Sequence, residues 1–365
     1  MYLVTFVSLI AILLTYLESK NVIKYGMLIG FILVSILGIL HYDYGNDYMA
    51  YYELYKDIVS YSFNLESIFN GEFFRDPAWV ILCYIFKPVG GFFMMVSVLT
   101  IIQNTIIYKF IKSEVTPNWR PIALFIYLFT TSLYLMSFSM LRQSLVMCVF
   151  LGIWPLIKNR KWMLALLILY VCSLIHSSAY ILMPFAFWGF ISFKKGKFWA
   201  IAFAVTFVVL WASKSLLQDI FDRFLMIEQL SSYGRYMDKG REALTSVGIG
   251  YIIKIIPFIV GEIYFLKSES INNDKSKVLA LSMVGFMVTP FTQIIDLFSR
   301  FSFYFDFFSM ATIPFTYQSI KNKYVRYSVL FLFVSITILD YTNFFSNPMW
   351  SRFYGRFNTI IPHII

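Results

Sequence analysis

Residues 1–20 read MYLVTFVSLIAILLTYLESK, an apolar run long enough to enter a bilayer as a helix and free of charge until Glu18. No basic residue precedes the run and no small-residue cleavage site follows it, so we expect a first transmembrane helix and not a removable signal. The whole chain has the same character: 59% of its 365 residues are hydrophobic and 14% are charged, with a mean hydropathy of +0.71. Soluble domains carry about a quarter charged residues. The sequence therefore predicts an all-α polytopic integral membrane protein.

Apolar stretches of spanning or nearly spanning length recur along the chain and predict about 12 transmembrane helices. They cover 2–17, 22–40, 91–112, 120–138, 139–157, 161–177, 178–193, 198–216, 247–266, 278–297, 301–318 and 325–342. The stretch 77–86 is too short to cross and predicts a short re-entrant or interfacial helix. No polar segment has the size of a domain, so we expect a single transmembrane domain, 1–365, which includes two outer loops at 41–77 and 217–246.

Basic residues in alternate connections predict the orientation. One set of connections holds Lys20, Lys24, Lys109, Lys112, Arg120, Lys158, Arg160, Lys161, Lys194, Lys195, Lys197, Lys267, Lys275, Lys277, Lys321, Lys323 and Arg326. This lysine-rich side is predicted to be cytoplasmic. The net charge of +10 does not indicate nucleic-acid binding, because the charges form short clusters between apolar spans.

Arginine dominates the opposite side and the spans: Arg75, Arg142, Arg223, Arg235, Arg241, Arg300, Arg352 and Arg356. The planar guanidinium suits bidentate contact with phosphate or carboxylate, so this distribution favours an anionic ligand held outside. The alternative is that some of these arginines pair with acidic neighbours. Lys254 lies within the span 247–266 and is open to both interpretations, as an ion-pair partner or as a ligand contact.

The stretch 41–57, HYDYGNDYMAYYELYKD, follows an apolar span and carries six tyrosines, five of which form one set: Tyr44, Tyr48, Tyr51, Tyr52 and Tyr55. At helical spacing they share one face, and Asp43 and Asp47 flank it. An aromatic stripe beside carboxylates predicts a ledge that binds sugar rings. The alternative is an interfacial tyrosine belt of the kind that membrane proteins carry routinely.

Charged or titratable residues within spans are costly and indicate functional sites. Arg142, followed by Gln143, lies near the outer end of one span, His176 near the outer end of another, and Arg300 near a third. We expect them to converge at one depth, although Asp296 is spaced to form a helix-face ion pair with Arg300. The cysteines Cys83, Cys148 and Cys172 show no metal-ligand spacing and are expected to be core residues. No nucleotide-binding or hydrolase motif is present.

The order of short motifs resembles a known family. GNDYMAY (45–51) is followed by RDPAW (75–79), LRQS (141–144), KNRK (158–161), IHSSAYILMPF (175–185) and SRFSFYF (299–305). This order resembles the Wzy-type polymerases of bacterial surface polysaccharide (O-antigen or exopolysaccharide), in their EpsG-like branch, over roughly residues 40–320.

The resemblance implies a GT-C-like membrane glycosyltransferase without a metal or other cofactor, whose donor is an undecaprenyl-pyrophosphate-linked oligosaccharide. It implies that Arg142, His176 and Arg300 are recurring polar residues, and that Asp43, Asp47 and Tyr48 form the outer-loop motif. The family's E-P-G-Y-like stretch falls at Arg75–Trp79, where this sequence departs from it.

On this basis we expect catalysis to involve Arg142, His176, Arg300, Asp47 and Asp43. The five tyrosines, Gln143, Arg235, Arg241 and Lys254 are expected to contact substrate. The expected location is the bacterial cytoplasmic (inner) membrane with the site facing the periplasm or exterior, and a chain-length regulator and a flippase are candidate partners. Two alternatives stay open: a membrane O-acyltransferase of surface glycans, and a polysaccharide lipid flippase or transporter.

Overall fold

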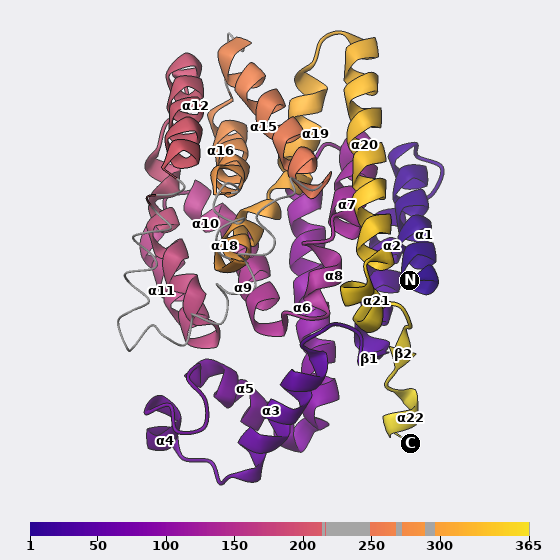
Figure 1. The fold of residues 1–365 in the computed structure, drawn as a ribbon, viewed down its shortest axis with the longest axis vertical. Coiled ribbons are helices and arrows are strands. Elements are labelled where there is room, and N and C mark those ends of the chain that lie inside the picture. The colour runs from indigo at the N-terminus through magenta and orange to yellow at the C-terminus, as the bar shows by residue number, and fades with distance from the viewer. Residues whose placement is uncertain (214–215, 217–248, 268–271, 289–295, 365) are drawn as a thin grey trace. The chain divides into compact units, whose positions relative to one another are not determined.

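The computed structural model describes residues 1–213, 216, 249–267, 272–288 and 296–364 (Figure 1). They fall into two compact units: unit 1 is Met1–Phe190 with Tyr341–Ile365, and unit 2 is Ile191–Asp340. Apart from one two-stranded pair, the regular elements of the described residues are helices, so the prediction of an all-α membrane protein is confirmed.

The helices of unit 1 are α1 (Tyr2–Ser19), α2 (Gly26–Leu40), α3 (Tyr48–Ser60), α4 (Leu65–Phe69), α5 (Pro77–Phe86), η1 (Lys87–Val89), α6 (Gly91–Glu114), η2 (Pro117–Trp119), α7 (Arg120–Phe129), α8 (Tyr134–Ser137), α9 (Leu141–Gly152), α10 (Trp154–Lys158), α11 (Trp162–Ile175), η3 (Ser177–Phe190), α21 (Pro348–Tyr354) and α22 (Ile361–Ile364). Unit 2 contains α12 (Gly196–Ala212), α15 (Ile249–Lys267), α16 (Asn273–Met287), α18 (Asp296–Asp306) and α19 (Ser309–Ser319). The helix α20 (Lys323–Ser346) includes residues of both.

Four helical segments among the described residues are long and apolar enough to cross a membrane: Tyr2–Ser19, Gly91–Glu114, Leu141–Lys158 and Lys323–Ser346. The 24 residues of α6 extend about 36 Å at 1.5 Å per residue, more than the apolar thickness of a bilayer. Shorter apolar helices accompany them, among them α2, α11 and α12. The protein is therefore multi-pass.

Three predicted spans differ from the structure. Over 301–318 the helix is interrupted, because α18 ends at Asp306 and α19 begins at Ser309. The prediction of one helix over 120–138 is wrong: α7 ends at Phe129, and a turn precedes the short helix α8. The stretch 178–193 is not an α-helix but the long 3-10 helix η3. A 3-10 helix rises about 2.0 Å per residue, so its 14 residues reach about 28 Å, nearly the length of a full crossing.

Buried polar side chains connect α2, α6 and α7. Asn104 donates to Ser35 Oγ (3.1 Å) and accepts from the Tyr127 hydroxyl (2.8 Å). Tyr134, at the start of α8, donates to the carbonyl of Val34 (3.0 Å). Between membrane helices the hydrophobic effect supplies little attraction, so such hydrogen bonds and close packing fix the neighbours.

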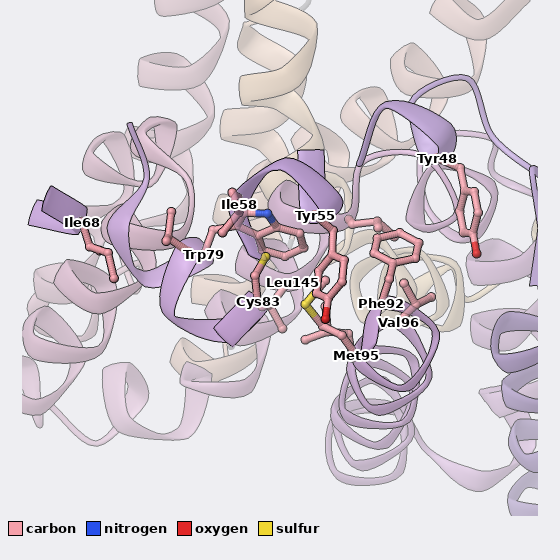
Figure 2. Close-up of a cluster of buried hydrophobic side chains, with 13 residues drawn as sticks. Tyr48, Tyr55, Ile58, Ile68, Trp79, Cys83, Phe92, Met95, Val96 and Leu145 are labelled. Atoms are coloured by element: carbon pink, nitrogen blue, oxygen red, sulfur yellow. The ribbon is translucent and has the colours of Figure 1, made fainter. Parts of the chain in front are cut away.

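The helices α3, α4 and α5 gather at one end of the longer helices of unit 1 (Figure 1). Figure 2 shows the apolar cluster that holds them there, in which Trp79 and Cys83 of α5 and Tyr55 of α3 meet Phe92 of α6 and Leu145 of α9. All three cysteines are free and buried, which confirms their prediction as core residues. The predicted helix at 77–86 is present as α5; its re-entrant or interfacial placement stays a prediction.

The C-terminal part of unit 1 packs on the loop that follows α2. The strands β1 (His41–Tyr42) and β2 (Asn358–Thr359) pair antiparallel, with His41 opposite Thr359. The amide of Gly45 donates to the carbonyl of Phe353 (3.2 Å). The ring of Tyr44 lies edge-on to Phe138 (5.2 Å) and to Tyr354 (5.1 Å). The loop at 41–47 is thus held in place by residues more than 300 positions away in the sequence.

Candidate functional site

Arg142 forms a buried ion pair with Asp76 in unit 1. Arg142 is the second residue of α9, and Asp76 is the N-cap residue of α5, just before Pro77. The Asp76 side chain is 1% exposed and that of Arg142 is 11% exposed. A charge so far from water needs a partner, and each supplies it for the other.

Two aromatic rings flank the guanidinium of Arg142. Its central carbon lies 4.6 Å from the ring centroid of Phe74 and 5.4 Å from that of Tyr51. Nε also donates to the Tyr51 hydroxyl across 3.4 Å. Tyr51 in turn lies edge-on to Trp79, with 5.7 Å between the ring centroids. The cation is therefore held by an acid, a hydroxyl and two π-faces.

Asp76 also reaches the junction between α11 and η3. The backbone N–H of Ser177 donates to its carboxylate, and Arg75 Nε lies 3.6 Å from it. His176 caps the C-terminus of α11 in an extended conformation and is 7% exposed. Through Asp76 the structure therefore links Arg142 to the backbone amide that follows His176. The convergence of the His176 side chain with Arg142 stays a prediction.

Burial raises the pKa of the Asp76 carboxyl above its ordinary value. The guanidinium groups of Arg142 and Arg75 and the Ser177 amide oppose that rise because each stabilises the ionised form. Two guanidinium groups and a backbone N–H thus surround one carboxylate. The same kinds of group stabilise the negative charge of a phosphate oxygen.

The G-N-D part of the loop at 45–47 docks on the turn that precedes Arg142. The hydroxyl of Ser139 donates to the Asn46 side chain, and the Asp47 amide donates to Ser139 Oγ (3.2 Å). Asp47 is half-buried and is the N-cap residue of α3. Asp43 is exposed and adopts a positive φ of 46°. Both predicted acids thus belong to the loop that docks on the turn before Arg142, and the backbone amide of Asp47 bonds to that turn.

The prediction of one exposed ledge of five tyrosines is wrong. Tyr44 precedes α3, and Tyr44 and Tyr48 are each 0% exposed. Tyr55 is also buried, so the tyrosine face of α3 packs against the core. Tyr51 and Tyr52 are half-buried, and they remain available for a ligand. The helical period places the α3 tyrosines on one face correctly, but that face turns inward because Phe92 and its neighbours on α6 cover it.

Replacing Tyr48 by alanine is expected to lower the free energy of unfolding by about 3–5 kcal/mol, as for other large buried aromatic side chains. Tyr61, which is 56% exposed, is the control, and its replacement by alanine should cost less than about 1 kcal/mol. Denaturation of the purified proteins in one detergent measures both. Equal stability of the two variants would mean that the Tyr48 side chain is not packed in the core and could contact a sugar.

Gln143 was predicted to contact substrate, but its side chain is 2% exposed and faces the protein interior. Gln143 is one of the buried residues of α9, so its side chain is not accessible to a ligand in this structure.

Four further residues predicted for the site have no described side chain. Arg235 and Arg241 lie outside the described residues. Arg300 belongs to α18 and Lys254 to α15, both in unit 2, and the side chains of both also lie outside what the structure describes. The convergence of Arg300 with Arg142 and His176 stays a prediction.

Sequence reasoning did not assign a role to Asp76, Phe74 or the Ser177 amide. The available signal was the acid before Pro77, since Asp-Pro is a common helix start and an acid beside a buried arginine is its natural partner. The separation of 66 residues between Asp76 and Arg142 hid the pair. Across the described residues, no cluster of His, Cys, Asp or Glu has the geometry to hold a metal ion.

Comparison with known proteins agrees with the order of the motifs. No curated protein and no solved structure matched the chain. The model of the EpsG family matches residues 3–355, which include every element of the site described above. The protein belongs to the EpsG family.

Proposed function

We propose that this protein is a polysaccharide polymerase that joins undecaprenyl-pyrophosphate-linked oligosaccharide repeat units, acting as an inverting GT-C-type glycosyltransferase. Family membership supports a polysaccharide polymerase-like membrane protein. The observation that carries the finer proposal is the nearly buried guanidinium of Arg142, held beside His176 at one end of the unit 1 helices. A fixed cation at the end of an apolar bundle suits a lipid with a diphosphate headgroup.

Arg142 is proposed to contact the donor diphosphate. Its hydrogen bonds to described residues use Nη1 for Asp76 and Nε for Tyr51, and Nη2 has none among those residues. A guanidinium with one nitrogen in reserve can donate to a phosphate oxygen while the other contacts keep it in place. Negative charge grows on the diphosphate as the glycosidic bond breaks, so a donor fixed beside it stabilises the transition state. Arg300 is proposed to share this role.

The acceptor is the non-reducing-end sugar of a second lipid-linked unit. Its hydroxyl oxygen attacks the anomeric carbon of the donor glycan, and the bond from that carbon to the pyrophosphate oxygen breaks. Undecaprenyl pyrophosphate leaves with the bonding electron pair, and the hydroxyl proton passes to a base. His176 is the proposed base, with Asp47 or Asp43 as the alternatives. One displacement inverts the anomeric centre.

The lysine-rich connections support a cytoplasmic side opposite the site, and hence a reaction on the outer face of the cytoplasmic membrane. Three residues of unit 1 lie at helix ends that an alternating path would place on the outer side. They are Arg142 at the start of α9, His176 at the end of α11 and His41 at the end of α2. A flippase that supplies the lipid-linked unit and a chain-length regulator are the proposed partners.

The arrangement around His41 disfavours the O-acyltransferase alternative, which is expected to use a histidine and an arginine near the first spans. His41 is 2% exposed, its Nδ1 lies 2.7 Å from the carbonyl of Gly38, and the rings of Tyr48 and Phe138 enclose it. Burial lowers the pKa of His41 to about 4, so it stays neutral at physiological pH. Among the described residues, no arginine forms a hydrogen bond or a ring contact with His41.

Reconstitution in liposomes with a purified lipid-linked repeat unit tests the proposal. A ladder of products on a gel, each one repeat longer than the last, is the expected result. A single band of one repeat would contradict the polymerase. Its mass would then separate the alternatives, since an added acyl group indicates an acyltransferase and an unchanged unit moved across the bilayer indicates a flippase.

A further inference from the structure

We propose that Asp76 is a positioning residue of this site, one that acts through Arg142 and the backbone at Ser177. The inference rests on the proposed function, because it concerns the group that contacts the diphosphate. Asp76 is 1% exposed, so a lipid-linked sugar cannot reach its carboxylate directly. Its contacts are with the protein: Arg142 Nη1, Arg75 Nε and the Ser177 amide.

The three partners come from three separate segments. Asp76 ends the loop before α5, Arg142 begins α9, and Ser177 begins η3 directly after His176. The apolar cluster of Figure 2 fixes α5 against α3, α6 and α9, so the carboxylate has a rigid support. One buried anion therefore sets the distance between the guanidinium and the His176 backbone.

The rings on either side restrict the guanidinium further. With Phe74 at 4.6 Å and Tyr51 at 5.4 Å, rotation of the Arg142 side chain away from Asp76 would also break two cation–π contacts. Asp76 determines which nitrogen faces the acid, and hence which nitrogen stays open to a ligand. A shift of about 1 Å in a group that orients a substrate can slow a reaction about 100-fold.

Substitution at Asp76 can remove the negative charge of the side chain while keeping its size. Asp76→Asn keeps an oxygen that can accept the Ser177 N–H bond but removes the charge that holds Arg142. We expect polymer formation at saturating lipid-linked donor to fall about 100-fold, with a smaller change in the apparent KM. Glu72→Gln is the matched control, because Glu72 is an exposed acid of the same loop, and its activity should stay within about twofold of the unaltered protein.

Asp76→Glu gives a second measurement if the asparagine variant fails to fold. It retains the charge but moves the carboxylate by one methylene, and a positioning role predicts about a tenfold loss in a folded protein. Activity equal to that of Glu72→Gln in either folded Asp76 variant would overturn the inference.

A double substitution shows whether Asp76 acts through Arg142. If it does, Asp76→Asn combined with Arg142→Gln should be within about threefold of Arg142→Gln alone, because the contact is already lost. Losses that multiply would overturn the inference and give Asp76 a role of its own. Binding of undecaprenyl pyrophosphate to each protein, measured by thermal shift, is the second readout. An unaltered protein that neither binds this lipid nor forms polymer refutes the proposed function itself, whereas normal activity in Asp76→Asn refutes only the present inference.

Discussion

Arg142→Gln should reduce polymer formation at least about 100-fold, the loss typical of removing one donor to a developing negative charge. The neutral amide of glutamine cannot supply the charge-assisted contacts of a guanidinium. Arg142→Lys should also be impaired, by about tenfold or more, because the three donors of an ammonium group spread from one nitrogen and cannot reproduce the planar, separated donors with which the guanidinium contacts Asp76 and Tyr51. The yield of laddered product from a lipid-linked repeat unit measures both.

Stability must be separated from activity in this experiment. Removing one partner of a buried ion pair leaves an uncompensated charge and costs about 3–5 kcal/mol. Arg142→Gln alone should therefore unfold more easily, while addition of Asp76→Asn should restore most of the lost stability without restoring polymer. Recovery of polymer in the double variant would mean that Arg142 serves the fold and not the reaction.

Arg75 provides the comparison within the same cluster. Its side chain is 57% exposed and its nitrogen lies 3.6 Å from the Asp76 carboxylate, so water screens the contact. Arg75→Gln should lower activity by no more than about threefold. An effect as large as that of Arg142→Gln would contradict the expectation that the buried arginine contributes more to activity than the exposed one.

Hydropathy predicted many of the helices well. The predicted spans 2–17, 91–112 and 161–177 correspond to α1, α6 and α11, since charged or glycine residues mark at least one end of each apolar run: Glu18 and Lys20 for α1, Gly91 and Lys112 for α6, and Lys161 for α11. The same measure failed over 120–138, because it records composition and not backbone geometry. The turn in this stretch contains the polar residues Thr130, Thr131 and Ser132. They are too few to lower the mean hydropathy of 120–138 below that of a spanning segment.

The tyrosines show a second limit of a sequence pattern. The spacing of Tyr48, Tyr51, Tyr52 and Tyr55 predicts a common helix face, and they share one. Whether that face meets solvent or protein depends on α6, which is distant in sequence and whose Phe92 ring lies 5.4 Å from that of Tyr48. The ion pair of Asp76 with Arg142 escaped prediction for the same reason, since it depends on how α5 packs against α9.

Gly45→Ala should impair both folding and activity, because two separate strains meet at this residue. Its φ of +119° suits glycine, and a Cβ there would approach the carbonyl oxygen of Phe138 to 2.7 Å. The conformational strain costs about 1–3 kcal/mol, and crowding against fixed backbone adds about 1–3 kcal/mol. Relief of the clash would move the loop at 45–47 away from Ser139, three residues before Arg142.

Gly71 allows the two strains to be measured apart. It has a φ of +77°, and no atom lies within 4 Å of the position that a Cβ would take. Gly71→Ala should therefore show only the conformational cost, with polymer formation close to that of the unaltered protein, whereas Gly45→Ala should lose stability further and lose polymer at least about tenfold. Denaturation midpoints measure the stability of the two variants, and product ladders measure their polymer formation. Equal losses would mean that glycine is needed at 45 for its backbone freedom alone, and that close contact between the loop and the turn before Arg142 does not contribute to activity.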